Sequence, residues 1–582
     1  MLSQLRTLFP YLIRYRWRYG AGFAALVLKN ATGAAIPLVI GFTIDHLAES
    51  FTMQSLFQLA GLLLSLALIK GLFQYWMRWI LIGISRDIEY DMNNDLFGHL
   101  MRLSQRFFNS YRTGDLMSRA TNDMNAVRLL LGPGIMYTVD VLLTFVVVLA
   151  VMSSTDWRLT CFVFLPIPLV SFTVSYFGRR IHDRFQRVQE KFSDISSLVQ
   201  QSLGSVRIVR AYAREAEEVR RFEELNEQYR GQNFKLIRLW AKFYPLLELL
   251  VGLTYVIVLW YGGRKVLEGG ITVGSFVMFM TYMAMLTWPM IGFGWVVNVI
   301  QRGVVSLERL NELLRQRPSI ADSEMTDFSI SSVRGDIEFR NVTVCYPGSE
   351  QAVLSNINLD IPAGQTLAIV GPTGSGKTTL VNLVPRLIDP REGQILVDGI
   401  DARKIPLEVL RSAIGLVPQE TLLFRQTVHE NIAFGRPEAE DWQVAEAARV
   451  ADIERDVEEF PEGFQTVVAE RGITLSGGQK QRTALARAIL RDPRILILDD
   501  SLSSVDTVTE ERILTQLRVL MRNRTTLMIS HRVSTARYAD QIVVLAGGRI
   551  RERGTHEELL ALEGYYFRLH QKQLIEEELE RV

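Results

Sequence analysis

The chain has 582 residues, of which 48% are hydrophobic, and its formal net charge is +1. This length exceeds one ordinary domain, and the near-zero charge excludes a general binder of polyanions such as nucleic acid. The only two cysteines, Cys161 and Cys345, fall in two halves of the chain that we assign to different domains, which excludes a disulfide framework and fits a reducing cytosol around Cys345.

The first half of the chain is strongly apolar. Six stretches of roughly 20 or more largely uncharged residues match the length that a bilayer core of about 30 Å demands of a helix. They are centred near residues 32, 68, 143, 169, 254 and 285. We therefore predict an α-helical, six-span transmembrane domain over residues 1–310, which begins with an interfacial segment rich in arginine and aromatic residues.

Basic residues indicate the orientation of these spans, because Lys and Arg concentrate in cytoplasmic loops. The connections after the second and fourth spans are long and basic, whereas the links after the first and third are short and poorly basic. Arg264 and Lys265, in an outer link, are the one contrary signal. We expect a multi-pass protein of the cell (inner) membrane, with both termini and the soluble half in the cytoplasm.

Lys29, Asp140 and Glu248 are charged residues within the first, third and fifth apolar spans. Unpaired charge is costly in lipid, so such residues either line a polar cavity or form structural ion pairs. The sequence leaves both roles open for all three.

The soluble half begins after a linker, residues 311–335, and we assign residues 336–582 to one nucleotide-binding domain. Its sequence contains patterns typical of strands, helices and glycine-rich turns. The motif "GPTGSGKTT" follows the apolar strand "TLAIV" and precedes helical text, the context in which a glycine-rich loop holds phosphates on backbone N–H groups and a helix N-terminus. We expect nucleotide contacts from Gly371, Thr373, Gly374, Ser375, Gly376, Lys377, Thr378 and Thr379.

Within that motif, Lys377 is expected to reach the β- and γ-phosphates, and Thr378 offers a hydroxyl to Mg²⁺. The apolar run "ILIL" ends in Asp499 and Asp500. A carboxylate at the end of a neighbouring buried strand is suited to hold the same magnesium, which we assign to Asp499. The run "TTLMISHR" repeats the pattern and ends in Ser530 and His531.

A second anion site is expected at "LSGGQ", residues 475–479, where a Ser-Gly-Gly loop opens a helix. We expect nucleotide contacts there from Ser476, Gly477, Gly478 and Gln479. One nucleotide does not need two such sites in one domain. The sequence therefore predicts that this loop faces a nucleotide held by another copy of the domain.

These motifs, in this order, resemble an ATP-binding-cassette (ABC) half-transporter of the exporter class, multidrug-resistance type, over nearly the whole chain. The resemblance implies a helical six-span transmembrane domain of the type IV exporter fold, fused to an α/β P-loop ATPase domain with a helical subdomain. It implies ATP and Mg²⁺ as cofactors, ATP hydrolysis coupled to transport, and membrane lipid and a second half-transporter as partners.

The resemblance also assigns roles to single residues. Tyr346 would stack on adenine, Gln419 would join Thr378 and Asp499 at the metal and link the attacking water to the membrane domain, and His531 would contact the γ-phosphate. Asp506 would belong to a loop that crosses the dimer interface. The segment "ERG", residues 470–472, and the segments 111–123 and 200–215 resemble parts that couple the two domains. In the last of these, Gln201 stands where glutamate is frequent.

Asp500 departs from the pattern of the family. The residue after the strand-end aspartate is usually a glutamate that activates the attacking water. Aspartate is one methylene shorter, which withdraws the carboxylate by about 1.5 Å, and an error of roughly 1 Å can cost on the order of a hundredfold in rate. We expect Asp500 to make hydrolysis at this chain's own site slow, while ATP binding and LSGGQ remain intact.

This asymmetry resembles one half of the bacterial heterodimeric exporters, whose other half keeps glutamate but has an altered signature. The alternatives are a homodimeric exporter or lipid flippase with two slow sites, or a membrane sensor ATPase that binds a ligand without moving it. The expected cargo is amphipathic or hydrophobic: drugs, lipids or peptides. The sequence does not identify it.

Overall fold

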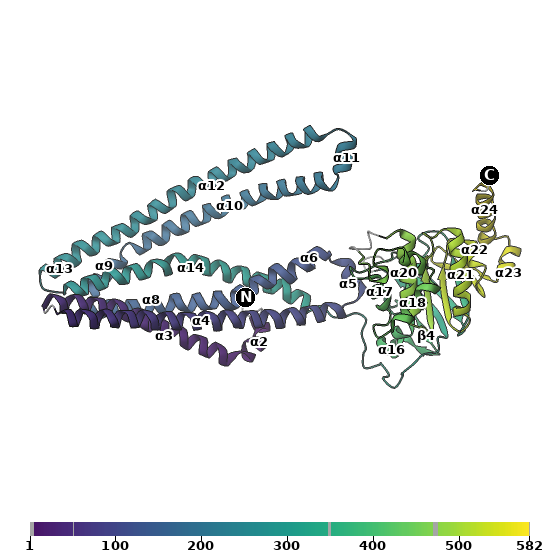
Figure 1. Ribbon diagram of the computed structural model, residues 1–582, viewed down its shortest axis with the longest axis horizontal. Coiled ribbons are helices and arrows are strands. Elements are labelled where there is room, and N and C mark those ends of the chain that lie inside the picture. The colour runs from purple at the N-terminus through teal and green to yellow at the C-terminus, as the bar shows by residue number, and fades with distance from the viewer. Residues whose placement is uncertain (1–4, 50–51, 347–350, 469–474, 581–582) are drawn as a thin grey trace. The chain divides into compact units, whose positions relative to one another are not determined.

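The computed structural model describes residues 5–49, 52–346, 351–468 and 475–580 (Figure 1). The chain divides into two compact units. The helical unit comprises Met1–Phe97 and Met117–Arg315, and the α/β unit comprises Gly98–Leu116 and Gln316–Val582.

The helical unit consists of long helices joined by short connections. In chain order, the helices up to Leu314 are η1 (Arg6–Leu8), α2 (Phe9–Arg14), α3 (Arg16–Glu49), α4 (Met53–Arg102), α5 (Gln105–Ser110), α6 (Thr113–Ser118), η2 (Arg119–Asp123), α7 (Met124–Leu129), η3 (Leu130–Gly134), α8 (Ile135–Thr155), α9 (Trp157–Phe164), α10 (Ile167–Gly204), α11 (Val206–Ala211), α12 (Glu215–Ile257), η4 (Val258–Gly262), α13 (Gly263–Leu267) and α14 (Val273–Leu314). The segments η2, η3 and η4 are single π-helical turns within longer helices.

Most of the expected spans coincide with these helices. Within the described residues, five helical segments are long and apolar enough to cross a membrane: Arg16–Ala48, Met53–Arg102, Thr113–Thr155, Trp157–Gly204 and Glu215–Leu267. The sixth expected span, centred near residue 285, falls on α14. Its described apolar part is the shorter segment Val273–Leu286, because the side chains of 287–291 lie outside the described residues.

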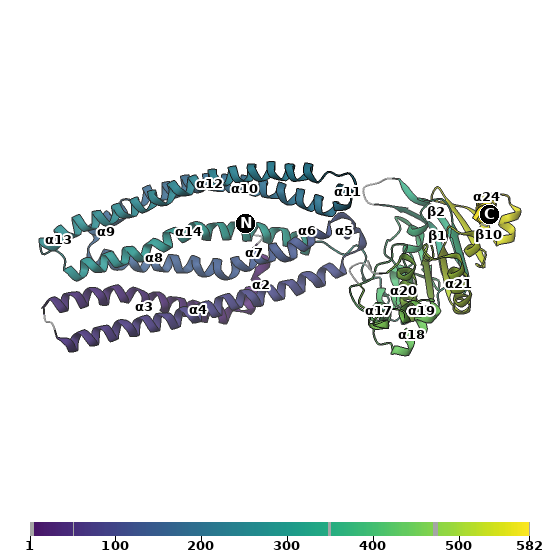
Figure 2. The ribbon, with the colours of Figure 1, turned by 45° about the horizontal axis from the view of Figure 1, so that its top comes forward.

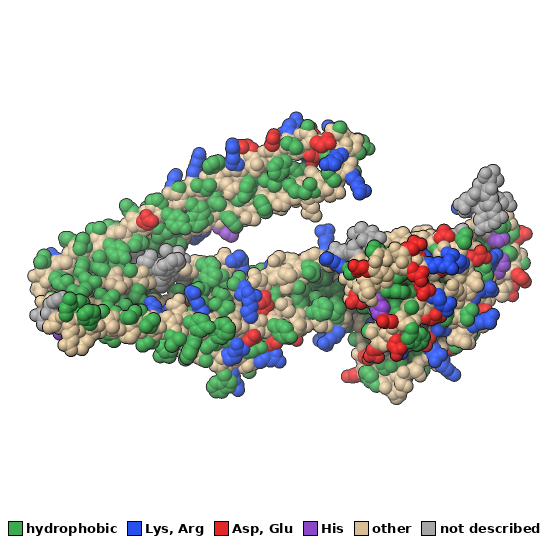
Figure 3. All heavy atoms as spheres, in the orientation of Figure 1, with side chains coloured by type: hydrophobic (Ala, Val, Ile, Leu, Met, Phe, Trp, Pro, Cys, Tyr) green, Lys and Arg blue, Asp and Glu red, His purple; other side chains and the backbone are tan. Residues whose placement is uncertain are grey.

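Helices α10 and α12 run side by side and diverge from the other long helices of their unit toward the end that carries α11 (Figures 1 and 2). The Ser202 hydroxyl donates to the Glu218 carboxylate at 2.6 Å and so ties the two helices together near this tip. Charged side chains gather there, whereas hydrophobic side chains dominate toward α13 (Figure 3). The second expected coupling segment, 200–215, lies at this polar tip, and its Ile208 and Tyr212 are exposed.

Two of the three charged residues expected in the spans form an ion pair. The Lys29 ammonium on α3 lies 2.7 and 3.0 Å from the two carboxylate oxygens of Asp140 on α8. The Asn30 amide also donates to Asp140 at 2.7 Å, and the Thr144 hydroxyl donates to Asn30 at 2.8 Å. This satisfied network joins α3 to α8. Glu248 lies elsewhere, exposed on α12.

The α/β unit contains two sheets. After residue 336 its elements are β1 (Ile337–Cys345), β2 (Ala352–Ile361), β3 (Thr366–Val370), α15 (Lys377–Asn382), β4 (Glu392–Val397), β5 (Ile400–Asp401), η5 (Ala402–Lys404), α16 (Leu407–Ser412), β6 (Ile414–Val417), α17 (Val428–Ala433), α18 (Asp441–Val450), α19 (Glu454–Glu458), η6 (Gly463–Gln465), α20 (Gly477–Leu490), β7 (Ile495–Asp499), α21 (Thr507–Met521), β8 (Thr525–Ile529), α22 (Val533–Ala536), β9 (Gln541–Ala546), β10 (Arg549–Gly554), α23 (His556–Ala561) and α24 (Tyr565–Glu580).

The three strands that precede the sequence motifs, β3, β8 and β7, are neighbours in one sheet. A four-stranded antiparallel sheet has the order β2-β1-β4-β5, and a six-stranded sheet has the order β10-β9-β3-β8-β7-β6. The neighbours β3, β8 and β7 are parallel and every residue in them is buried. Such strands carry near-continuous apolar runs because both faces of the sheet are covered. The expected strands before Gly371 and Asp499 are thereby confirmed.

The segment Gly98–Leu116 belongs to the α/β unit. Phe107 of α5 is buried, its ring lies 4.5 Å from that of Tyr111, and Ser104 and Ser319 share a hydrogen bond of 2.7 Å. The first expected coupling segment, 111–123, is therefore divided: residues up to Leu116 cluster with the α/β unit, and those from Met117 cluster with the helical unit.

Candidate functional site

The site lies where β3, β8 and β7 end. Parallel neighbours present their carboxyl ends at one edge of a sheet, the usual place for a ligand in an open α/β sheet. β3 leads into the loop 371–376, β7 ends at Asp499, and β8 is followed by Ser530 and His531. Residues more than 120 positions apart in the sequence are thus brought together, as the hydrogen bond from Thr378 to Asp499 shows.

The loop 371–376 requires glycine at two positions for reasons of space as well as conformation. Gly371 has φ 152°, and a Cβ there would lie 2.1 Å from the Leu545 carbonyl oxygen. Gly376, which precedes α15, has φ 99°, and its Cβ would lie 2.8 Å from the Leu354 side chain. The backbone can therefore curl tightly around a ligand only because neither residue has a side chain.

Two polar side chains, Ser375 in the loop and Lys377 directly after it, are buried. The Lys377 ammonium donates to the carbonyl oxygens of Gly371 and Pro372, both at 3.0 Å. Burial lowers the pKa of Lys377, against the opposing effect of Asp500 and Asp499. The Ser375 hydroxyl is buried without a hydrogen-bond partner in the structure, a cost that a ligand oxygen would remove. An anionic ligand such as a phosphate fits this donor set.

Thr378 and Asp499, to which the sequence analysis assigns Mg²⁺, lie in contact in the structure. The Thr378 hydroxyl donates to an Asp499 carboxylate oxygen at 3.2 Å. Burial raises the pKa of Asp499, and the nearby Asp500 carboxylate raises it further, while the Thr378 hydrogen bond, Lys377 and His531 lower it. Within the described residues, no group of three or more His, Cys, Asp or Glu could hold a metal by itself. One carboxylate and one hydroxyl suit Mg²⁺, which keeps waters and phosphate oxygens as its other ligands.

Asp500 has an unusual backbone conformation, with φ 48°, a region that Asp tolerates better than most residues. Its N–H donates to the Ile529 carbonyl at 3.1 Å, and its own carbonyl accepts from the Ser503 hydroxyl at 3.0 Å. These two contacts fix the turn after β7. The residue lines the same cavity as Lys377 and Asp499.

Most of the expected site residues surround one cavity of about 290 Å³. Val353 and Ile529, which the sequence analysis did not single out, also line it, and they carry no polar pattern that could have marked them. The expected residues that line it are Tyr346, Thr373, Gly374, Gly376, Lys377, Thr378, Thr379, Gln419, Asp499, Asp500 and His531. The Tyr346 hydroxyl also shares a hydrogen bond of 2.9 Å with Thr379.

The signature loop, Leu475–Gln479, is not part of this cavity. Ser476 is exposed and caps α20: its hydroxyl accepts from the Gln479 N–H at 3.2 Å, and the Gln479 side chain accepts from the Ser476 N–H at 3.0 Å. Gly477 and Gly478 form the first turn of α20. Asp506 is likewise exposed and accepts from the Thr509 N–H at 2.9 Å. The expected coupling segment "ERG", 470–472, lies outside the described residues.

Comparison with known proteins identifies the family of the chain. Residues 19–290 match the family described as "ABC transporter transmembrane region", and residues 354–503 match "ABC transporter". A probable multidrug resistance ABC transporter ATP-binding/permease protein, YheI of Bacillus subtilis (strain 168), is 38% identical, and the match covers 98% of each chain. The chain belongs to the ABC transporter family.

Other ABC relatives span the same length. The multidrug resistance-like ATP-binding protein MdlA of Escherichia coli (strain K12) is 34% identical over 97% of this chain and 96% of its own. An ATP-dependent lipid A-core flippase of Syntrophus aciditrophicus (strain SB) is 35% identical over 97% of this chain and 93% of its own. A solved bacterial Atm1-family ABC exporter with ATP bound matches with a TM-score of 0.80 at 27% identity, covering 96% of this chain and 98% of that chain.

The protein is accordingly an ABC exporter in which a transmembrane domain and an ATPase domain are fused in one chain. It is a multi-pass membrane protein with a cytoplasmic ATPase domain, which binds nucleotide and couples ATP hydrolysis to transport. The transmembrane match covers most of the helical unit, and the ATPase match lies within the α/β unit.

Proposed function

We propose that this chain is one half of a heterodimeric ABC exporter. In that assembly its own nucleotide site binds ATP and hydrolyses it slowly, while its signature loop completes the active site of a different partner chain. The observation that carries the proposal is Asp500: it lines the nucleotide cavity where the family usually has glutamate, while the signature loop of the same chain is intact.

The positions of the side chains support the proposed nucleotide roles. Backbone N–H groups of the loop 371–376 and the Lys377 ammonium would hold the phosphates. Thr378 and Asp499, with Gln419 beside them, would hold Mg²⁺, whose charge would offset that of the phosphates. Tyr346 would lie against the base, and His531 would face the γ-phosphate.

Asp500 is the residue that makes the site slow in this proposal. Its turn is fixed by contacts to Ile529 and Ser503, so the short side chain cannot easily advance toward an attacking water. A displacement of about 1.5 Å, one carbon–carbon bond, exceeds the tolerance of a positioned general base. ATP would therefore persist here and hold the two ATPase domains together.

The exposure of the signature loop supports a second chain. Ser476 and Gly477 are exposed at the start of α20, and the N–H groups of a first helical turn have no partners within their own helix. Those N–H groups and the polarity of α20 form an anion site. In the proposed dimer this site meets the γ-phosphate held by the partner, and the exposed tip at α11 docks on an ATPase domain.

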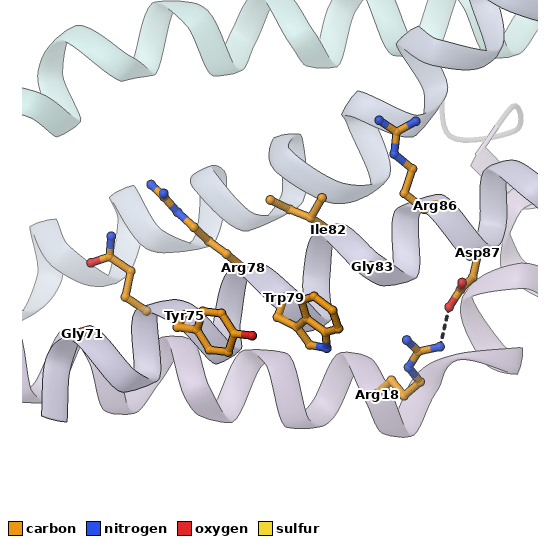
Figure 4. A pocket seen from close by; sticks show the side chains of 10 residues that line it. Arg18, Gly71, Tyr75, Arg78, Trp79, Ile82, Gly83, Arg86 and Asp87 are labelled. Carbon is orange, nitrogen blue, oxygen red and sulfur yellow. Dashed lines mark hydrogen bonds and ion pairs between the residues drawn. The ribbon is translucent and has the colours of Figure 1, made fainter. Parts of the chain in front are cut away.

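The cargo that the helical unit supports is amphipathic. A groove of about 820 Å³ lies along α3 and α4 and is lined by aromatic, apolar and arginine side chains (Figure 4). Arg78 and Arg86 extend from one side of α4 and Tyr75 and Trp79 from the other, while Arg18 and Asp87 form an ion pair. The named relatives, multidrug resistance proteins and a lipid A-core flippase, accord with drug or lipid cargo.

The proposal is tested by trapping nucleotide in the purified complex during turnover. With radiolabelled 8-azido-ATP and vanadate, photolabelling should leave ATP on this chain and trapped ADP on a second chain. Equal trapping of ADP on this chain would contradict a slow site. Transport into sealed vesicles separates an exporter from a sensor, because a sensor would show ligand-stimulated ATPase activity without movement of any compound across the membrane.

A further inference from the structure

The loop that follows β8 carries His531, yet the His531 side chain is exposed. Its position therefore depends on the backbone of the loop. The next helix, α22, begins at Val533, and the residue before it, Arg532, makes no side-chain cap. The first N–H groups of a helix need a partner from outside the helix.

That partner comes from the C-terminal helix α24. The Gln573 side-chain amide donates to the His531 carbonyl oxygen at 2.6 Å, and its oxygen accepts from the Val533 N–H at 2.7 Å. The two bonds use both the NH₂ group and the oxygen of the Gln573 side chain, and they join the loop to a residue 40 positions away. An amide held at both ends fixes the orientation of the peptide groups on either side of Arg532.

A second side chain holds the same loop from another helix. Glu510 of α21 is buried, and its carboxylate accepts from the side chains of Arg532 and Thr535. With Asp500 and His531, it lines a cavity of about 230 Å³ that adjoins the nucleotide site. Glu510 anchors the side chains of Arg532 and of Thr535 in α22, whereas Gln573 holds the backbone of His531 itself.

We propose that Gln573 is a positioning residue for the nucleotide site: it orients His531 toward the γ-phosphate. The inference rests on the proposed role of His531. It makes the C-terminal helix part of the machinery that distinguishes ATP from ADP, because only ATP has the phosphate that His531 would contact. Loss of Gln573 should therefore weaken ATP binding and leave ADP binding unchanged.

The test uses the full-length complex with photolabelling of this chain by 8-azido-ATP, competed by unlabelled ATP or ADP. Gln573→Ala removes both bonds. Gln573→Glu keeps an acceptor for the Val533 N–H and places a second acceptor against the His531 carbonyl. Gln571→Ala is the matched control, an exposed glutamine one half-turn earlier on the same helix. His531→Ala reports the full contribution of the histidine.

We expect Gln573→Ala and Gln573→Glu to lower the preference for ATP over ADP by roughly fivefold, the weight of one ordinary hydrogen bond, and Gln571→Ala to leave it unchanged. In a His531→Ala background, Gln573→Ala should have no further effect. Hydrogen exchange of the Val533 N–H in nucleotide-free protein should become faster in Gln573→Ala.

Three results would overturn the inference. Equal loss of ATP and ADP binding in Gln573→Ala would indicate general damage to the domain. An unchanged preference in both Gln573 variants, with a reduced one in His531→Ala, would leave the role of His531 standing and remove Gln573 from it. An unchanged preference in His531→Ala would refute the proposed role of His531, and the inference with it.

Discussion

Two loops of the α/β unit each precede a helix whose first N–H groups could bind an anion. The loops differ in how many other polar side chains surround them. The loop 371–376 lies in a cavity that also holds Lys377 and Asp499, and its glycines adopt positive φ. The signature loop lies outside that cavity, and its Ser476 side chain is engaged in capping its own helix.

The difference indicates which site this chain can complete alone. Around the first loop, the chain supplies a cation, a buried hydroxyl without a partner, and a carboxylate in contact with a threonine hydroxyl. Around the second, it supplies backbone donors at an exposed helix start. This supports the proposal that a phosphate at the signature loop belongs to a nucleotide held by another chain. Together with Asp500, this is the basis for assigning unequal tasks to the two loops.

The largest expected effect on ATPase activity comes from placing a negative charge in the signature loop. Gly477→Asp in this chain places a carboxylate where a phosphate should bind. We expect steady-state ATPase activity of the complex to fall by about 100-fold to 1000-fold, comparable to the loss of a backbone-type donor from an oxyanion site. Gly477→Ala is the control, because it adds the Cβ without the charge, and should retain most activity. Full activity of Gly477→Asp would show that the loop serves no active site.

The next largest effect, on the rate of hydrolysis at this chain's own site, comes from lengthening the side chain of residue 500 by one methylene. Asp500→Glu should raise single-turnover hydrolysis at this chain's site by about 100-fold, because it restores the reach of the carboxylate. Asp500→Asn, which has no basic group, should abolish the slow hydrolysis. Chemical quench followed by photolabelling measures the ratio of ATP to ADP on this chain, separately from that on its partner. An unchanged rate in Asp500→Glu would mean that another step limits this site.

The two loops should also differ in their tolerance of a methyl group. At Gly371 a Cβ would meet backbone at 2.1 Å, whereas at Gly477 it would lie 3.3 Å from the Ser504 Cβ. Gly371→Ala should lower the free energy of unfolding of the ATPase domain by about 2 kcal/mol, while Gly477→Ala should change it by less than about 1 kcal/mol. Denaturant titration followed by tryptophan fluorescence measures both. Equal stability of the two variants would contradict the structural difference between the loops.

The smallest expected effect is on turnover when this chain's own site is impaired. Lys377→Ala removes the cation that the cavity holds, so photolabelling of this chain by 8-azido-ATP should be largely lost. Steady-state ATPase activity should fall only a few-fold, because the partner's site carries the chemistry. A loss of activity as large as that of Gly477→Asp would show that the two loops contribute equally.

Much of the nucleotide site could be predicted from the sequence because buried parallel strands leave a clear pattern. The largely apolar runs before Gly371 and Asp499 form β3 and β7, which lie on either side of β8. The order of the strands, however, depends on which pairs pack best, and no local pattern contains it. Val353 lines the cavity from β2, a strand of the other sheet, and no local pattern predicts this.

The contacts that the sequence did not reveal join distant helices. Lys29 and Asp140 could be recognised as charges within apolar spans, but their pairing depends on how α3 packs against α8. Gln573 lies in a charged C-terminal helix that carries no catalytic pattern, and only the fold brings it to His531. The departure at Asp500, in contrast, was visible in the sequence because the motif around it is complete.

The most direct test of unequal sites is native mass spectrometry of the complex recovered from its own membrane with this chain tagged. The account predicts a mass equal to this chain plus a second, different chain of similar size, whose sequence has glutamate after its strand-end aspartate and an altered signature. A mass equal to twice this chain would contradict it, because both sites would then contain Asp500 and an intact signature.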